Sequence, residues 1–425
     1  MTKEPAPPFF TGAQWVYLAA CFVLFAVSGG LGFNFGVFIK PLVAEFDWSR
    51  SSVSLAYSIF MIALGPFSLM AGGLSDRFGS RPIILIGIIA YAASLFLSSG
   101  IQNLWQFYLL ASVLAGLGRS TFQIPLQTYI QRNFTHNRGL ATGLVGSGAG
   151  LGVLLISGFS GYMIALSGWR HTYYLLGFVC LIVALPMLLL LLRPQKPLKT
   201  PGAPKRPAPE PALLPEAAYG MGAILRRRTF WSVLGSHHFD CVCHSVIVVH
   251  IVPFAIEAGV SKIRAAALMG ALGLGAAFGR VFIGLIADRV GAKRALFTTL
   301  CVQTFAVPLL LLTNAYPAFV LLAALVGIGQ GGHGTMYPVV TREYYGPKRV
   351  GLLFGTFSFG ASLGMALGGF LGGLLHDLTG DYMLAFLFSF AVGLVSLALV
   401  RIYPSRGALP AAGEPERALL SQRSR

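Results

Sequence analysis

Long apolar runs separated by short polar breaks recur along the whole chain. Each run is long enough to cross a hydrocarbon layer of about 30 Å as a helix. The runs lie near residues 12–39, 52–72, 82–99, 104–126, 138–162, 172–193, 229–256, 264–286, 294–313, 317–340, 349–375 and 381–402. This pattern predicts an all-α integral membrane protein with twelve transmembrane helices.

A short motif occurs twice, 212 residues apart, and each copy lies between two apolar runs. The shared positions are Gly72, Asp76, Arg77 and Gly79 in the first copy and Gly284, Asp288, Arg289 and Gly291 in the second. The same displacement relates glycines of the fifth run to glycines of the eleventh. Internal duplication of this kind is typical of membrane transporters. We therefore expect two pseudo-symmetric halves of six helices each.

The two halves are joined by a segment of different composition. Residues 194–228 are rich in Pro, Lys and Arg, which predicts a solvated, semi-extended linker. The predicted organisation is a tail at 1–11, a six-helix bundle at 12–193, the linker at 194–228, a second six-helix bundle at 229–402 and a disordered tail at 403–425.

The composition excludes a soluble domain. Charged residues make up only 11% of the chain, against roughly 25% in soluble proteins. The net charge of +17 comes from Lys and Arg that gather in the tails and the even-numbered loops, with only five at the odd-numbered loops. By the positive-inside rule, this bias places both termini and the linker in the cytoplasm. We expect the chain to reside in the plasma (cytoplasmic or inner) membrane. The basic excess is therefore a topology signal, and we expect a lipid bilayer and no nucleic acid as partner.

The repeated motif resembles the loops after helices 2 and 8 of the major facilitator superfamily, and the resemblance covers the whole chain. It implies that the two aspartates accept hydrogen bonds from neighbouring helix N-termini. It also implies that Arg77, Arg81 and Arg289 contribute to a gate on the cytoplasmic side, because a guanidinium can bind carboxylates or helix C-terminal carbonyls.

A second resemblance concerns the fifth and eighth runs. The segment from Phe134 through Arg138 to Gly143 is similar to the start of span 5 in monocarboxylate transporters and in bacterial oxalate–formate exchangers. Arg280, four residues before Gly284, matches the arginine that binds the substrate carboxylate in the monocarboxylate family. The match is incomplete, because Ala276 stands where the proton-linked animal carriers have an aspartate.

Three ionisable side chains lie well inside the predicted spans: Arg119, Asp240 and Arg280. An ionised group at mid-membrane costs roughly 2.5–3.5 kcal/mol on insertion scales, and arginine cannot escape by losing its proton. One acid cannot neutralise two guanidinium groups, which predicts an anionic substrate. We expect Arg280 to bind it, with Arg119 as a secondary ligand. A structural pair with Asp240 is the alternative for either arginine.

The resemblance also implies that spans 1, 4, 7 and 10 line the substrate cavity. Gln123 follows Arg119 by one helical turn, and His333 and Tyr337 share one face of span 10. We expect these three residues to contact substrate, together with the following three side chains: Asn34, His250 and Phe359. Helix packing is the alternative for the span-10 face. Asp240 and His250 are the candidates for binding a coupled proton, because both can change charge.

The seventh span also contains a cluster that invites a metal interpretation, since His237, Cys241 and His244 share a helical face. We expect no metal and no cofactor, because no second segment supplies obvious ligands. The chain contains no nucleotide-binding loop or serine elbow, so the sequence predicts no enzyme.

These features together predict a secondary active transporter that moves a small monocarboxylate, such as lactate or pyruvate, by alternating access with proton symport. Anion exchange of the oxalate–formate type is the main alternative. Drug efflux is disfavoured because Gly148-Ala149-Gly150 stands where drug–proton antiporters have a Gly-Pro pair. A non-transporting sensor is disfavoured because no folded domain is appended.

Overall fold

The computed structural model describes residues 9–134, 136–192 and 221–404, and all regular secondary structure within these ranges is helical. The first half contains α1 (Gly12–Gly32), α2 (Phe35–Phe46), α3 (Arg50–Phe78), α4 (Ser80–Ser98), α5 (Leu104–Phe107), the π-helical turn η1 (Tyr108–Leu114), α6 (Ala115–Asn133) and α7 (Arg138–Leu192). The second half contains α8 (Met221–Leu225), α9 (Arg228–Glu257), α10 (Lys262–Val290), α11 (Ala292–Leu310), α12 (Tyr316–Tyr345), α13 (Val350–Thr379) and α14 (Met383–Arg401).

All twelve predicted spans are helical, but their connections differ from the prediction. The first span is divided into α1 and α2 at Phe33 and Asn34, and the fourth consists of α5, η1 and α6. The fifth and sixth spans are joined in α7, which bends at Gly168 where φ is +81°. Such a φ is favourable only for glycine. Within the described ranges, nine helical stretches are long and apolar enough to cross a membrane, and one of them, residues 138–191, contains both the fifth and the sixth span.

The repeated motif is not a loop, as the sequence suggested, but the end of a helix. Asp76 lies in the last turn of α3, and Asp288 lies in the last turn of α10. Each helix stops at the final glycine of its motif, with φ of +87° at Gly79 and +89° at Gly291. The next helix begins at the following residue. A single left-handed glycine therefore reverses the chain, and no longer loop is needed.

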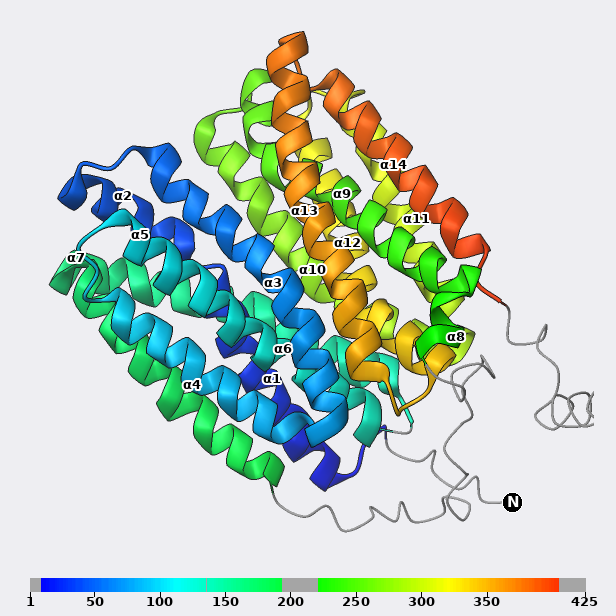
Figure 1. Cartoon of the computed structure of the whole chain (residues 1–425). Coiled ribbons are helices and arrows are strands. Elements are labelled where there is room, and N and C mark those ends of the chain that lie inside the picture. The colour runs from blue at the N-terminus through cyan, green and yellow to red at the C-terminus, as the bar shows by residue number, and fades with distance from the viewer. Residues whose placement is uncertain (1–8, 135, 193–220, 405–425) are drawn as a thin grey trace, which may run out of the picture.

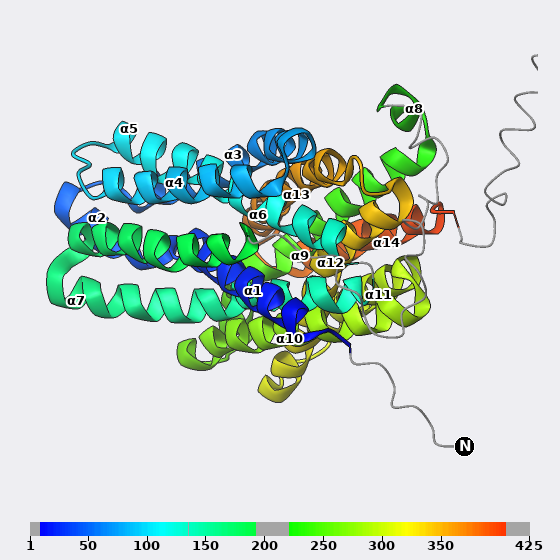
Figure 2. The same cartoon turned by 90° about the horizontal axis from the view of Figure 1, so that it is seen from below.

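The two halves lie side by side in Figure 1, with the first half running from blue to green and the second from a brighter green to red. The start of α1 and the end of α14 lie at the same end of the bundle, which we call the terminal face (Figure 1). The halves meet near this face and diverge toward the opposite end. Figure 2 shows the same arrangement from below, with α10 of the second half beside α7 of the first.

The seam between the halves is formed by two helix pairs, α3 with α13 and α7 with α10. Both pairs approach closely enough that only glycine fits. A methyl group added to Gly72 or Gly355 on the first pair would collide with backbone of the facing helix. The same holds for Gly143 and Gly284 on the second pair. Small residues of this kind are what allows membrane helices to pack backbone to backbone.

Parts of the predicted organisation lie outside the described residues. These are positions 1–8 of the first tail, positions 193–220 of the boundary and linker region, and positions 405–425 of the second tail. The described end of the predicted linker contains the short helix α8.

Candidate functional site

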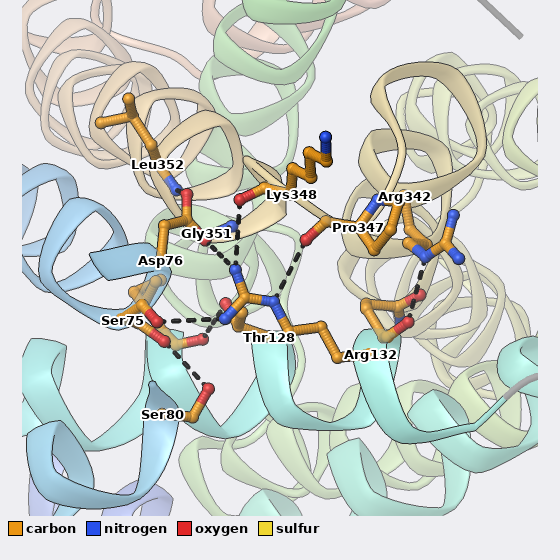
Figure 3. A network of polar contacts seen from close by, with 12 residues as sticks. Ser75, Asp76, Ser80, Thr128, Arg132, Arg342, Pro347, Lys348, Gly351 and Leu352 are labelled. Carbon is orange, nitrogen blue, oxygen red and sulfur yellow. Dashed lines mark hydrogen bonds and ion pairs between the residues drawn. The ribbon is translucent and has the colours of Figure 1, made fainter. Parts of the chain in front are cut away.

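At the terminal face, Asp76 at the end of α3 binds the N-terminus of α13. Its two carboxylate oxygens accept hydrogen bonds from the backbone N–H groups of Gly351 (2.9 Å) and Leu352 (2.7 Å). Arg132 on α6 pairs with the same carboxylate and also donates to the carbonyl oxygen of Pro347 at 3.1 Å (Figure 3). One carboxylate thus caps a helix of the opposite half and holds an arginine between the halves.

The second motif makes the mirror contact. Asp288 at the end of α10 accepts hydrogen bonds from the backbone N–H groups of Gly139 and Leu140, both at 2.8 Å, at the N-terminus of α7. The 212-residue displacement maps this contact onto the first one, residue by residue. A carboxylate at a helix N-terminus is favourable because it faces unpaired N–H groups and the positive end of the helix dipole.

Among the described residues, the arginines of the two motifs form no hydrogen bond or ion pair between the halves. Arg77 is exposed, with its guanidinium 5.1 Å from the ring centroid of Phe78 beside it. Arg289 is also exposed, and Arg81 lies 5.8 Å from the ring centroid of Tyr129 within its own half. Arg132 instead binds the carboxylate, which the sequence analysis did not foresee. The available signal was a basic residue in the last turn of both α6 and α12, namely Arg132 and Arg342.

Arg280 lies directly at the seam. A methyl group on Gly143 of α7 would collide with the backbone of Arg280, and one on Gly146 would lie 3.3 Å from its Cδ. The residue as a whole is half-buried. Within the described ranges it has no hydrogen bond and no ion pair with a carboxylate. The alternative of a structural pair with Asp240 is therefore absent from this arrangement.

Asp240 is engaged inside the second half instead. Oδ1 accepts a hydrogen bond from Nε2 of Gln303 at 2.7 Å, and Oδ2 lies 3.0 Å from Nδ1 of His333. All three side chains are buried. His237 stacks on Tyr337 with ring centroids 3.7 Å apart, and completes a network across α9, α11 and α12. The structure thus brings together Asp240, His333 and Tyr337, as well as Gln303, for which the sequence offered no signal.

The sequence argument against a metal rested on the lack of a second segment with ligands. The structure contains such a segment. His333 of α12 joins three residues of α9, and the potential ligand atoms of Asp240, Cys241, His244 and His333 all lie within 4.8 Å of one another. We assign these groups to a hydrogen-bonded network, because the Asp240 carboxylate already faces Gln303 and His333. The sequence argument failed because the pattern of residues on α9 does not reveal which residues of α12 pack against it.

Arg280 and the Asp240 network lie at the same depth. Arg280 is ten residues before the end of α10, and Asp240 is twelve residues after the start of α9. At 1.5 Å per residue, both are about 15–18 Å from the terminal face. Phe359 of α13 also reaches across the seam, where its ring contacts Gly65 of α3. A guanidinium, a buried carboxylate beside an imidazole and an aromatic ring thus share the central layer of the molecule.

Two residues expected in the cavity wall lie elsewhere. His250 is buried between α9 and α13, and its Nε2 lies 3.0 Å from the carbonyl oxygen of Gly369. It is ten residues beyond Asp240, or about 15 Å further from the terminal face. Asn34 is buried within the first half, where its Nδ2 donates to Ser160 at 2.7 Å. Both side chains thus hydrogen-bond to neighbouring helices of their own half, His250 from within α9 and Asn34 from the break between α1 and α2.

Arg119 lies on α6 and is 6% exposed, whereas Gln123 one turn later is half-buried. The guanidinium lies 4.3 Å from the ring centroid of Phe33 and 5.6 Å from that of Phe60. Its Nε and Nη1 have no hydrogen-bond partner among the described residues. Among the described residues, Asp240 therefore neutralises neither Arg119 nor Arg280.

Two helical bundles that meet along a glycine-lined seam, with ionisable groups at mid-depth, are typical of membrane carriers built from internal repeats. The chain matches the model of the Major Facilitator Superfamily over residues 18–304 and 244–424, and it belongs to this superfamily.

The comparisons also identify individual relatives. The chain is 30% identical over 295 residues to monocarboxylate transporter 11 of Homo sapiens, covering 68% of this chain and 59% of that one. It is 26% identical over 292 residues to the uncharacterized MFS-type transporter YcxA of Bacillus subtilis, covering 68% of each. The fold is similar to that of the E. coli fucose:proton symporter, with a TM-score of 0.68, 15% identity, and coverage of 92% of this chain and 98% of that one. The chain thus spans less than two thirds of the human relative's length.

Proposed function

We propose that the protein is a secondary active transporter of a small organic monocarboxylate, with Arg280 as the group that binds the carboxylate. The observation that carries this proposal is the Arg280 guanidinium, which lies at the seam with no carboxylate of the described chain as partner. A guanidinium binds a carboxylate through two parallel hydrogen bonds, and it keeps its charge at any physiological pH. The similarity to monocarboxylate transporter 11 supports the same substrate class.

We further propose that transport proceeds by alternating access at the seam. The contacts of Asp76 and Asp288 close the terminal face, while the halves diverge toward the other end (Figure 1). Breaking both contacts frees each half to rock about the layer that contains Arg280. The terminal face lies in the cytoplasm in this proposal, because Lys and Arg are concentrated there, and the chain resides in the plasma membrane.

The proposed coupling ion is a proton, bound between Asp240 and His333. Oδ2 of Asp240 and Nδ1 of His333 face each other at 3.0 Å, and neither has a hydrogen bond to another described group. One shared proton neutralises this pair and leaves the positive Arg280 to be balanced by the substrate. The other titratable groups packed around the pair are His237, Cys241, Cys243 and His244 on α9, Tyr337 on α12 and Tyr403 after α14.

Uptake of radiolabelled lactate, pyruvate, acetate and oxalate into proteoliposomes tests the proposal. We expect an inward proton gradient to accelerate uptake of the monocarboxylates, and Arg280→Ala to abolish it with the protein still inserted. Uptake by Arg280→Ala at the wild-type rate contradicts the assignment of Arg280. Acceleration by internal anion alone, with no response to the proton gradient, indicates an exchanger instead.

A further inference from the structure

We infer that the terminal face of the second half contains a binding site for a phosphate group that is carried by an anionic membrane lipid. The site is an open pocket of about 690 Å³ where α10, α12 and α14 end and α11 begins. Volumes of roughly 300–1,000 Å³ are usual for sites that bind small molecules. The inference goes beyond the proposed transport activity, because the pocket begins at Val290, ten residues beyond Arg280 or about 15 Å along α10.

The lining of the pocket carries an excess of positive charge. Three basic side chains line it, from Lys293, Arg294 and Arg401, and Glu343 is the only acidic residue among its described lining residues. Oε2 of Glu343 accepts a hydrogen bond from the backbone N–H of Ala292 at 3.3 Å, which directs this carboxylate toward the start of α11. Three positive charges against one negative charge leave a surplus of two, which favours an anionic ligand.

The two arginines are the groups available to a ligand. Arg294 and Arg401 are both exposed, and within the described ranges neither guanidinium forms a hydrogen bond or an ion pair. A guanidinium presents several N–H donors in a fixed plane and keeps its charge at any physiological pH. This geometry matches the oxygen atoms of a phosphate, which accept two parallel hydrogen bonds from one arginine.

Contacts between α11 and α14 hold these cations around one space. Nζ of Lys293 on α11 donates to the carbonyl oxygen of Arg401 at 3.2 Å and also to that of Tyr403. The end of α14 is thereby fixed to the start of α11. The Arg401 guanidinium lies 5.7 Å from the ring centroid of Phe297, one turn into α11. Both helices thus contribute basic groups to the same pocket.

The corresponding place in the first half lacks these arginines. The 212-residue displacement maps Arg294 onto Pro82 and Arg401 onto Leu189. The register is supported by α4 and α11, which are both 19 residues long and both begin directly after the last glycine of a motif. The duplicated fold therefore forms without a cation at either position, which favours a binding role for the two arginines over a structural one.

The surroundings of the pocket favour a lipid as the carrier of the phosphate. Phe297, Cys301 and Phe305 follow one face of α11 at intervals of four residues, from the pocket away from the terminal face. None of the three is buried, and Phe305 is 51% exposed. An acyl chain can lie along this apolar stripe, whereas a soluble phosphate makes no use of it. On the proposed cytoplasmic side of the membrane, anionic headgroups lie at the level of such basic groups.

Native mass spectrometry of the purified full-length chain tests the site, with phosphatidylglycerol, phosphatidylcholine or inorganic phosphate added. We expect phosphatidylglycerol to bind more tightly than phosphatidylcholine, since choline cancels the charge of the phosphate. The double variant Arg294→Gln/Arg401→Gln is expected to weaken phosphatidylglycerol binding roughly 30-fold in Kd and to remove this preference. The matched control is Arg77→Gln/Lys348→Gln, which removes two exposed charges from the same face outside the pocket. It should keep the wild-type Kd.

A second variant tests the pocket with both arginines in place. Thr298→Glu adds a negative charge at an exposed lining position, so it is expected to weaken phosphatidylglycerol binding as well. This variant decides the matter if the double variant does not fold, and wild-type binding in Thr298→Glu then overturns the site.

Three other results contradict the proposal. Equal binding of the two lipids by the wild-type chain overturns the site, and so does equal weakening in the control variant. Inorganic phosphate that binds as tightly as phosphatidylglycerol, with the same dependence on the two arginines, overturns the lipid as ligand and identifies a soluble phosphate instead. None of these measurements involves transport, so their failure is distinguishable from failure of the Arg280 proposal.

Discussion

In the second half, the Asp240 carboxylate is held by Gln303 and His333, whereas in the first half the guanidinium of Arg119 has only ring faces around it. The two groups occupy corresponding regions of a duplicated fold, yet they carry opposite charge. The second half therefore contains an acid, Asp240, beside a histidine. Among the described residues of the first half, Arg119 has no carboxylate as partner.

The seam shows a similar contrast. Its backbone contacts are repeated closely, because Ser68 faces Gly355 in the first helix pair as Arg280 faces Gly143 in the second. Their side chains differ in charge and reach, and Ser68 lies 3.4 Å from Ser120 within its own half. Duplication has kept the geometry that lets the halves pack and move. The charge that we propose to bind the substrate, Arg280, has an uncharged serine, Ser68, at its counterpart position.

The largest expected effect tests this contrast at the seam. Arg280→Ala removes one partner of a charge pair with the proposed substrate, which costs about 2–5 kcal/mol. This corresponds to a loss of at least about 30-fold in kcat/KM for proteoliposome uptake. Ser68→Ala, at the corresponding position, is expected to stay within about twofold of wild type. Equal losses in both variants would show that the seam position matters for packing and not for its charge.

The second prediction concerns the proton. Asp240→Asn cannot release or bind the proton, so uptake is expected to lose its acceleration by an inward proton gradient while exchange of internal for external substrate continues. Ser28→Ala, the counterpart in the first half, should leave the gradient response unchanged. An Asp240→Asn variant that still responds fully to the gradient places the coupling site elsewhere.

The third prediction addresses closure of the seam. A methyl group in Gly143→Ala would collide with the carbonyl oxygen of Arg280, and overpacking of this kind costs about 1–3 kcal/mol. We expect the distance between spin labels at the exposed positions Arg77 and Lys348 to increase. Gly150→Ala on the same helix is the control, because nothing lies within 4 Å of the added methyl group. An unchanged distance distribution in Gly143→Ala would contradict closure by this contact.

The smallest expected effect separates the arginines at the terminal face. Arg132→Gln removes a charged hydrogen bond to Asp76, worth about 1.5–3 kcal/mol in buried settings and less at a partly exposed one. A fall of a few degrees in Tm is expected. Arg77→Gln should change Tm by less than that, since its guanidinium only lies near Phe78. If Arg77→Gln proves the more damaging variant, the contact that we assign to Arg132 is misplaced.

The sequence was sufficient to predict the spans, the duplication and the acceptor role of Asp76 and Asp288, since these follow from apolar length and from a repeated motif. It was wrong about the arginine that binds the Asp76 carboxylate, because the spacing of the motif does not reveal that Arg132 of α6, and not Arg77, contacts this carboxylate. It also failed to pair Asp240 with His333, which are far apart in the chain and meet only when α9 and α12 pack. His250 and Asn34 show the same limit, because residues on a cavity-lining helix can still face its own bundle.

The contacts of Asp76 and Asp288 are crossed, since each aspartate caps a helix encoded by the other half of the chain. A fragment that carries one half alone would leave one carboxylate and one set of helix N–H groups unsatisfied at its edge. Two such fragments made together would each supply the carboxylate that caps a helix of the other. The covalent connection ensures equal numbers of the two halves, and the capped helix ends hold them together.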